Sequence, residues 1–254
     1  MLNTRVIPCL LLSNGRLVKT IHFENSKYIG DPINAVKIFN EKEVDELIVL
    51  DIDASKRQTK PDYDLLANIA SECFMPVCYG GGVTSIDEAT RIVQLGIEKV
   101  AINAAAINNY DLVAEISQAL GAQSVVVSVD VKNDFLGRPR VFNASTSKLT
   151  NLAPEAYVKE LQIAGAGEIL LNRIERDGTQ EGYDLNLIKN LSQTISIPLI
   201  VCGGAGNMEH FVDAVAAGAS AVAAGSMFVF QGKHRAVLIS YPFYNELENL
   251  LGKK

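Results

Sequence analysis

Pro198-Leu-Ile-Val-Cys-Gly-Gly-Ala205 decides the fold, because it joins a continuous apolar run to a pair of glycines. An apolar run without polar alternation is typical of a strand that is buried on both faces, as in a parallel sheet. The same arrangement occurs earlier in the chain as Pro76-Val-Cys-Tyr-Gly-Gly-Gly82. A segment with helical periodicity follows each copy, at Met208–Ala217 and Ile86–Leu95. The sequence therefore predicts two strand–turn–helix units of the same design.

Similar apolar runs continue outward from these two units. The eight predicted strands are Arg5–Leu10, Glu46–Ile52, Pro76–Tyr79, Lys99–Asn103, Ser124–Asp130, Glu168–Arg173, Pro198–Cys202 and Ala221–Gly225. Further helical segments, such as Ala153–Ala164 and Leu185–Gln193, lie between them. Alternation of strands and helices predicts a parallel sheet. Eight such units in 254 residues predict a closed (β/α)8 barrel, the TIM-barrel fold.

An internal repeat supports the barrel. Glu46-Leu-Ile-Val-Leu aligns with Glu168-Ile-Leu-Leu-Asn, and Lys99-Val-Ala-Ile-Asn aligns with Ala221-Val-Ala-Ala-Gly. The offsets between the aligned stretches fall between 120 and 123 residues. We therefore expect one domain made of two similar half-barrels, roughly residues 1–122 and 123–254.

Composition excludes several classes of protein. The net charge of −6 gives no electrostatic support for nucleic-acid binding. There is no run of about 18 apolar residues and no signal-peptide cleavage site, so we expect a cytoplasmic protein without a membrane span. The four cysteines form no CxxC pair, and we interpret them as reduced and buried. The chain has no cofactor motif and no metal-binding cluster, so no cofactor and no metal are expected.

Glycine-rich turns at the carboxyl ends of the predicted strands indicate phosphate binding. Glycine there lets backbone N–H groups approach a phosphate closely, and the active site of such barrels lies at this end. The candidate phosphate-binding residues are Gly81, Gly82, Asn103, Gly178, Gly203, Gly204, Gly225 and Ser226. Because the pattern occurs in both halves, it favours a ligand with a phosphate at each end. The alternative is that the glycines only form tight turns.

Ionisable groups at the same ends are the candidate catalytic residues. Asp130 ends the fifth predicted strand and suits general acid–base catalysis. The repeat places Leu11 at the equivalent position of the first strand, and a leucine cannot transfer a proton. Three further candidates are Asp53 after the second strand, Lys19 in the long first loop, and Asp177 after the sixth strand.

Each of these further candidates has a structural alternative. Asp177 could be a turn or N-cap residue, and Lys19 could be solvated rather than close over a phosphate. The three histidines, His22, His210 and His234, are interpreted as surface or structural residues away from strand ends.

Over essentially its whole length the sequence resembles the cyclase subunit of imidazole glycerol phosphate synthase, the HisF family. The stretches that carry the resemblance are Gly15–Lys19, Gly30–Pro32, Asp45–Leu47, Leu50–Ile52, Gly80–Gly82, Asp130, Gly165–Leu170, Arg176–Thr179, Gly182–Asp184 and Gly203–Gly206. The resemblance implies a HisH-type glutaminase partner, whose ammonia passes along the barrel axis. It also implies a bis-phosphorylated ribulosyl nucleotide as substrate. The implied products are imidazole glycerol phosphate and aminoimidazole carboxamide ribotide.

The resemblance further implies a gate of four alternating charges at the bottom of the barrel, where the ammonia enters. The matching residues here are Arg5, Glu46, Lys99 and Glu168, each at the start of a predicted strand. Charges at the bottom face of a barrel ordinarily serve stability. A closed ring of two cations and two anions could serve both stability and gating.

Two features depart from the family pattern. The family's two catalytic aspartates fall at positions 11 and 130, and position 11 is Leu11 here. The loop around Asn143–Ser147 is also poorer in glycine than the family's phosphate-contacting stretch.

The C-terminal stretch Gly232–Pro242 resembles a paralogous branch found with surface-polysaccharide genes. That likeness implies relay of ammonia to an amidotransferase that makes acetamidino sugars, and we favour this role. The alternatives are an active cyclase, in which Asp130 works with another acid such as Asp53, and a non-enzymatic activator of a glutaminase. A sugar-isomerising half-barrel relative of the same pathway ranks behind them, because it lacks the four-residue gate.

Overall fold

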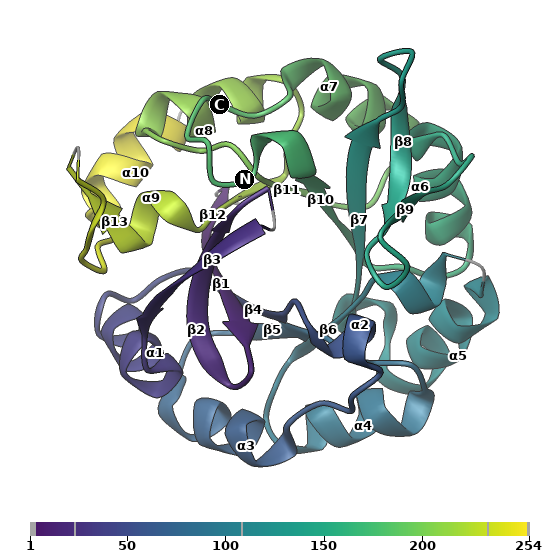
Figure 1. The fold of residues 1–254 in the computed structure, drawn as a ribbon, viewed down its shortest axis with the longest axis horizontal. Helices are drawn as coiled ribbons and strands as arrows, with labels where there is room; N and C mark the ends of the chain where they lie inside the picture. The colour runs from purple at the N-terminus through teal and green to yellow at the C-terminus, as the bar shows by residue number, and fades with distance from the viewer. Residues whose placement is uncertain (1–3, 23, 108, 233, 253–254) are drawn as a thin grey trace.

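The computed structural model describes residues 4–22, 24–107, 109–232 and 234–252. Eight parallel strands close on themselves in the order β1-β4-β5-β6-β7-β10-β11-β12, and β12 pairs again with β1 (Figure 1). Their bounds are β1 Arg5–Ser13, β4 Leu47–Asp51, β5 Val77–Gly80, β6 Lys99–Ile102, β7 Val125–Asn133, β10 Glu168–Arg173, β11 Leu199–Cys202 and β12 Ala221–Ala224. The predicted (β/α)8 barrel is therefore confirmed, with all eight strands in place.

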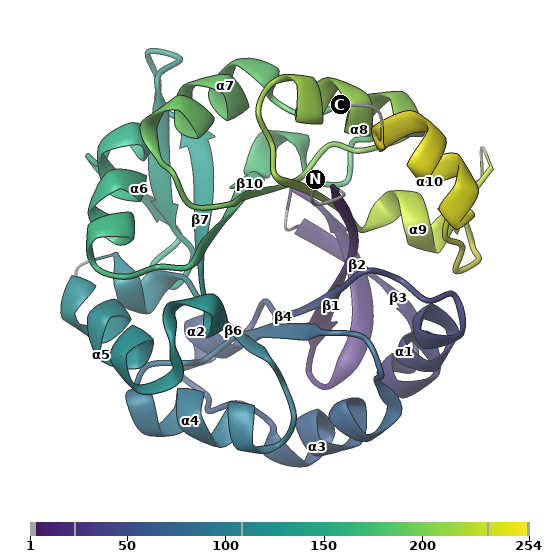
Figure 2. The ribbon, with the colours of Figure 1, turned by 180° about the vertical axis from the view of Figure 1, so that it is seen from behind.

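Helices surround the barrel on its outer side, as the views from its two ends show (Figures 1 and 2). Their bounds are α1 Pro32–Glu41, α2 Ala54–Arg57, α3 Tyr63–Glu72, α4 Ile86–Gln94, α5 Tyr110–Leu120, α6 Pro154–Ile163, α7 Leu185–Thr194, α8 Met208–Ala216, α9 Ser226–Val229 and α10 Tyr244–Leu251. Several begin at a side chain that accepts a backbone N–H three residues on, as Ser85 does for α4 and Asn207 for α8.

Residues of each strand alternate between two apolar layers. Along β1, Val6 and Leu10 belong to the layer between the strands and the helices, whereas Ile7, Cys9 and Leu11 point into the barrel interior. The interior layer also takes apolar side chains and cysteines from the other strands. Burial on both faces explains why the strands read as continuous apolar runs in the sequence.

Antiparallel hairpins extend the barrel beyond the prediction. β1 continues to Ser13 and pairs with β2 (Arg16–Ile21), which pairs with β3 (Glu24–Gly30). β7 continues to Asn133 and pairs with β8 (Pro139–Asn143), which pairs with β9 (Lys148–Leu149). A third, short hairpin joins β13 (Phe230–Gln231) and β14 (Ala236–Val237). Because part of each long hairpin is polar and exposed, apolar runs alone did not reveal it.

The expectations about the cysteines, a membrane span, a metal site and His22 can be compared with the fold. Cys9, Cys73, Cys78 and Cys202 are all free thiols, as expected, but Cys73 and Cys202 are only half-buried. No described helix is both long and apolar enough to cross a membrane. The described side chains include no group of three or more His, Cys, Asp or Glu placed to hold a metal ion. His22 lines the cavity described below rather than lying away from it, because its backbone N–H donates to the carbonyl oxygen of Asp177 at 3.1 Å.

Candidate active site

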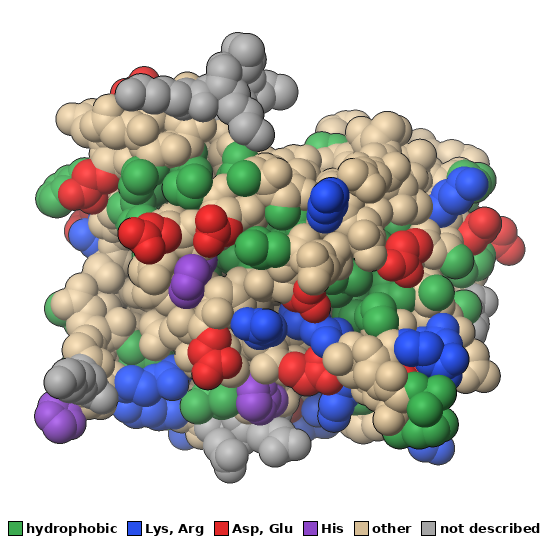
Figure 3. All heavy atoms as spheres, turned by 90° about the horizontal axis from the view of Figure 1, so that it is seen from above, with side chains coloured by type: hydrophobic (Ala, Val, Ile, Leu, Met, Phe, Trp, Pro, Cys, Tyr) green, Lys and Arg blue, Asp and Glu red, His purple; other side chains and the backbone are tan. Residues whose placement is uncertain are grey.

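A cavity of about 740 Å³ opens at the carboxyl ends of the strands; we call it the mouth. The Lys and Arg side chains in Figure 3 lie mostly in the lower half of that view, on the side where these strand ends and the hairpins lie. All four predicted catalytic residues, Asp130, Asp53, Lys19 and Asp177, line this cavity. The structure therefore brings together side chains from four widely separated parts of the chain.

Asp130 is held at the mouth by amides from the two neighbouring strands. Asn103 Nδ2 donates to its Oδ2 at 2.8 Å, and Asn172 Nδ2 donates to its Oδ1 at 2.9 Å. Burial raises the pKa of Asp130 above its ordinary value, and the two amide donors act in the opposite direction. A buried carboxylate with a raised pKa, fixed in one orientation, is suited to accept a proton from a ligand.

Leu11 occupies the place on β1 that Asp130 occupies on β7. Val6 of β1 pairs with Val222 of β12, and Val125 of β7 pairs with Val100 of β6. Val222 and Val100 are equivalent in the repeat, so Val6 is equivalent to Val125. Further along the same two strands, Leu11 is therefore equivalent to Asp130. The next strands agree, because Leu11 pairs with Leu50 and Asp130 pairs with Asn172. Leu11 is 2% exposed and packs within the interior apolar layer. The mouth therefore has a carboxylate on one side and a hydrocarbon wall at the equivalent place on the other.

Lys19 lies on strand β2 and not in a loop, which corrects the sequence expectation. It is 6% exposed, and its Nζ is 3.9 Å from Asp177 Oδ1. A side chain on Gly225 would collide with Lys19 Nζ, so the lysine lies directly against the Gly225–Ser226 turn. The alternative of a solvated Lys19 is wrong, because pairing of β2 with β1 carries the side chain inward.

Asp177 is a buried turn residue. It ends the short 3-10 helix Ile174–Arg176 and accepts a hydrogen bond from Thr20 Oγ1 at 3.2 Å. Its side chain therefore contacts the β2 strand and lies beside Lys19, while Gly178 follows beneath Thr20 and Ile21. This arrangement fixes the Lys19 ammonium group at the edge of the mouth.

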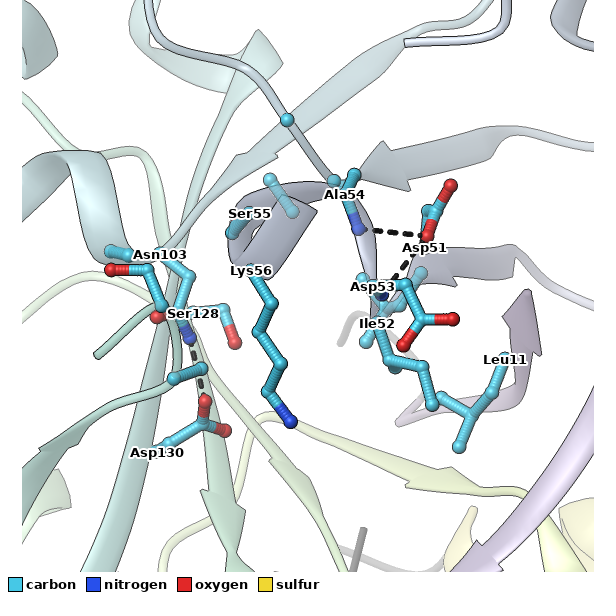
Figure 4. Close-up of a pocket in the computed structure, with 18 of the residues that line it drawn as sticks. Leu11, Asp51, Ile52, Asp53, Ala54, Ser55, Lys56, Asn103, Ser128 and Asp130 are labelled. Carbon is cyan, nitrogen blue, oxygen red and sulfur yellow. Dashed lines mark hydrogen bonds between the residues drawn. The ribbon is translucent and has the colours of Figure 1, made fainter. Parts of the chain in front are cut away.

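Asp53 lies across the mouth from Asp130, with the Lys56 side chain between them (Figure 4). Ser13 Oγ donates to Asp53 Oδ2 at 2.5 Å, and Arg57 forms an ion pair with it at 3.4 Å. The Asp51 carboxylate has different partners, because its Oδ1 accepts the backbone N–H groups of Asp53 and Ala54. Asp53 is thus already paired with Arg57, which makes it a poor substitute for a carboxylate at position 11.

The predicted phosphate-binding glycines form two cradles. The first cradle is defined as Gly81, Gly82 and Asn103, and the second as Gly203, Gly204, Gly225 and Ser226. Gly82 and Gly204 have φ values of +70° and +122°, and a Cβ on either would collide with a backbone carbonyl, of Thr59 or Gly182. Only glycine fits such positions, and it leaves backbone N–H groups open to a ligand.

Ser226 supplies the polar side chain of the second cradle. Ser226 Oγ is buried and has no hydrogen-bond partner among the residues that the structure describes. A buried hydroxyl without a partner is costly, and a ligand oxygen is one way to satisfy it. Gly178 lies on the Lys19 side of this cradle, under the β2–β3 hairpin.

A closed ring of ion pairs lies at the opposite end of the barrel. Arg5 contacts both Glu46 and Glu168, the latter at 2.7 Å, and Lys99 contacts the same two glutamates at 2.8 and 3.1 Å. Glu46 is 1% exposed. Alternate residues along a strand point inward and lead from the ring to the mouth. Examples are Lys99, Ala101 and Asn103 along β6, and Glu168, Leu170 and Asn172 along β10. The ring and the mouth are thus separated by the apolar interior layer.

Among the side chains of the mouth that the sequence analysis missed are Asn172 and Lys56. Asn172 could have been found, because alternate residues of its strand, starting at Glu168, point inward. Lys56 gave no such signal, since it belongs to the four-residue helix α2 in an otherwise irregular segment.

The fold and the site together define a class: closed (β/α)8 barrels with a polar mouth at the carboxyl ends of the strands and an ion-pair ring at the other end. Residues 5–235 match the family described as Histidine biosynthesis protein, and the chain belongs to this family.

Named relatives agree with that assignment. The chain is 51% identical to a protein of Pseudomonas aeruginosa provisionally named imidazole glycerol phosphate synthase subunit hisF2, over 98% of this chain and 99% of the relative. It is 46% identical to the similarly named hisF3 of Vibrio vulnificus, over 99% and 97%. It is 41% identical to the imidazole glycerol phosphate synthase subunit HisF of a Thermotoga species, over 91% of each chain.

Proposed function

We propose that this chain is the ammonia-accepting barrel of a glutamine-dependent complex. In this proposal it is a paralogue of the cyclase subunit that passes ammonia on to the amidation of a sugar. The observation that carries the proposal is the combination of an intact ion-pair ring with a mouth that has Leu11 in place of a second carboxylate.

The ring and the interior support the delivery of ammonia. A HisH-type glutaminase would dock at the ring end, where Arg5, Glu46, Lys99 and Glu168 lie. Neutral ammonia can cross the apolar layer that follows, whereas ammonium would lose its hydration there without compensation. The apolar interior therefore favours passage of the neutral molecule over passage of the ion.

The mouth supports binding of a ligand with a phosphate at each end, one in each cradle. The glycine turns, the unpartnered Ser226 hydroxyl and the adjacent Lys19 fit this role. Asp130 would accept a proton from the ligand, including the proton that the nitrogen loses once ammonia has bonded to a ligand carbon. Cyclisation needs a second proton-transfer group, and Leu11 supplies none.

The alternative is a working cyclase of histidine biosynthesis, which would form imidazole glycerol phosphate and aminoimidazole carboxamide ribotide. The observation in its favour is that both phosphate cradles and Asp130 are retained. In that case Asp53 would have to act as the second acid, despite its ion pair with Arg57. Loss of one general acid or base typically costs about 10²–10⁴-fold in rate, so such a cyclase would be slow.

The test follows the nitrogen. The protein is combined with a HisH-type glutaminase, glutamine labelled with ¹⁵N in its amide, and either the bis-phosphorylated ribulosyl nucleotide or a sugar acceptor with its amidotransferase. The proposal expects label in the sugar and little label in an imidazole product. Label in imidazole glycerol phosphate at the rate of an ordinary cyclase would support the alternative instead. Stimulation of the glutaminase without transfer to either acceptor would leave only an activator role.

The ring provides a matched control. Lys99→Met removes a cation of the ring, whereas Lys37→Met removes an exposed cation that pairs with Glu72 on the outer helices. The proposal expects loss of glutamine-dependent transfer in Lys99→Met with transfer from added ammonium salts retained, and no change in Lys37→Met.

A further inference from the structure

The two long hairpins of the barrel occupy equivalent places but carry different residues. Leu12 pairs with Leu17 in the β1–β2 hairpin, and Val131 pairs with Val141 in the β7–β8 hairpin. Because Leu11 is equivalent to Asp130, these two pairs are equivalent as well. Leu17 then corresponds to Val141, and Lys19 corresponds to Asn143. The second cradle therefore receives an ammonium group from its hairpin, and the first cradle faces a neutral side chain.

Asn143 is also engaged elsewhere. Its Oδ1 accepts from the backbone N–H groups of Ser145 and Thr146 at 3.0 and 3.2 Å, which closes a local turn. The two arginines of the same hairpin, Arg138 and Arg140, both pair with Asp134. The β8 strand therefore contributes no free cation to the first cradle.

Lys56 is one of the four lysines that line the mouth; the others are Lys19, Lys60 and Lys132. Its helix α2 packs on the first cradle, since a Cβ on Gly82 would lie 3.2 Å from Ala54 Cβ. Figure 4 shows the Lys56 side chain extending from α2 into the mouth, with its ammonium group between Asp130 on one side and Asp53 on the other. Within the described part of the chain, Lys56 forms no ion pair, although its charge is close enough to lower the pKa of Asp130.

We infer that Lys56 is the phosphate-binding cation of the first cradle, and that it does for Gly81, Gly82 and Asn103 what Lys19 does for the second cradle. The inference rests on the proposed function, in which a phosphate occupies each cradle. The ligand class is a phosphate monoester dianion, for which an ammonium group and backbone N–H groups together are a suitable site. A bis-phosphorylated ligand would then span the mouth with a lysine at each end and Asp130 beneath it.

The experiment uses inorganic phosphate as the probe. Crystals grown without phosphate or sulfate are soaked in phosphate, and binding is titrated by calorimetry in solution. The variants are Lys56→Met, Lys19→Met and Lys56→Arg, with Lys189→Met as a matched control on the exposed outer face of α7. Lys132→Met is included because Lys132 also lines the cavity.

We expect Lys56→Met to lose phosphate from the first cradle and to keep it in the second, with at least about ten-fold weaker binding at the affected site. Lys19→Met should show the converse, Lys56→Arg should retain both phosphates, and Lys189→Met should match the wild type. Unchanged phosphate in the first cradle of Lys56→Met would overturn the inference. So would its loss in Lys132→Met alone, because the cation would then be Lys132. A wild-type protein with phosphate in neither cradle would contradict the ligand of the proposed function itself.

Discussion

The two sides of the mouth are built on equivalent positions and differ in chemistry. On one side Asp130 is held by Asn103 and Asn172. On the other side the equivalent positions carry Leu11, Gly225 and Leu50. The hydrogen-bonded side chains of Asp130, Asn103 and Asn172 on the first side thus correspond to two leucines and a glycine of the second cradle on the other.

The opposite end of the same strands matches only in its anions. Glu46 and Glu168 are equivalent in the repeat, and each bridges Arg5 and Lys99. Both cations come from the first half, because Ser124 corresponds to Arg5 and Ala221 corresponds to Lys99. In (β/α)8 barrels the carboxyl ends of the strands carry chemistry and the other end carries stability, so the difference at the mouth is the one expected to change function.

The largest effect is expected from the ring, where the equivalent residues Glu46 and Glu168 bridge the same two cations. Glu46→Ala and Glu168→Ala each leave two cations without one of their partners, and each should lower the free energy of unfolding by about 3 kcal/mol. Urea unfolding monitored by circular dichroism measures this. Glu72→Ala, which breaks the exposed pair with Lys37, is the control and should cost under about 1 kcal/mol. An effect of only one of the two ring variants would show that the two glutamates do not contribute equally to the ring.

An intermediate effect is expected at the polar side of the mouth. Asn172→Leu removes a donor from the buried Asp130 carboxylate and should cost about 2 kcal/mol. In an Asp130→Leu background the same substitution should cost almost nothing, since Leu then faces Leu as it does at positions 11 and 50. The four unfolding free energies of this double-mutant cycle give the coupling. Equal costs in both backgrounds would mean that the Asn172–Asp130 hydrogen bond contributes nothing to stability.

The smallest expected effect is a pH dependence. Burial raises the pKa of Asp130 in the folded protein above its unfolded value. The folded state then holds the proton more tightly, so the wild type should lose stability as pH rises from the unfolded pKa through the folded one. Asp130→Asn removes this term, and its stability relative to the wild type should increase across that window and level off above it. Unfolding free energies at a series of pH values measure the difference, and a constant difference between the two proteins would contradict the raised pKa.

The sequence predicted the barrel because its strands recur with regular spacing, and the resemblance to the HisF family indicated the four residues of the ring. Continuous apolar runs marked all eight strands, and the charges of Glu46, Lys99 and Glu168 stood where those runs begin. The offsets between the halves also make Leu11 the equivalent of Asp130, and the strand register agrees, because Leu11 pairs with Leu50 as Asp130 pairs with Asn172.

The remaining parts of the mouth depend on segments without such periodicity. Lys19 was expected in a loop, because the β1–β2 hairpin turns at polar, exposed residues and gives no continuous apolar run. Asp51 accepts the backbone N–H groups of Asp53 and Ala54 at the start of α2, and these contacts orient the four-residue helix that carries Lys56. Contacts of this kind arise from tertiary packing and cannot be read from local pattern.

The most direct test is ammonia-dependent turnover of the bis-phosphorylated ribulosyl nucleotide by the purified chain, with Leu11→Asp measured beside it. The account predicts little or no turnover by the wild type and a clear gain in Leu11→Asp, because the substitution places a second carboxylate at the position equivalent to Asp130. Wild-type turnover at the rate of an ordinary cyclase, without a gain in Leu11→Asp, would contradict it and identify the chain as a working cyclase.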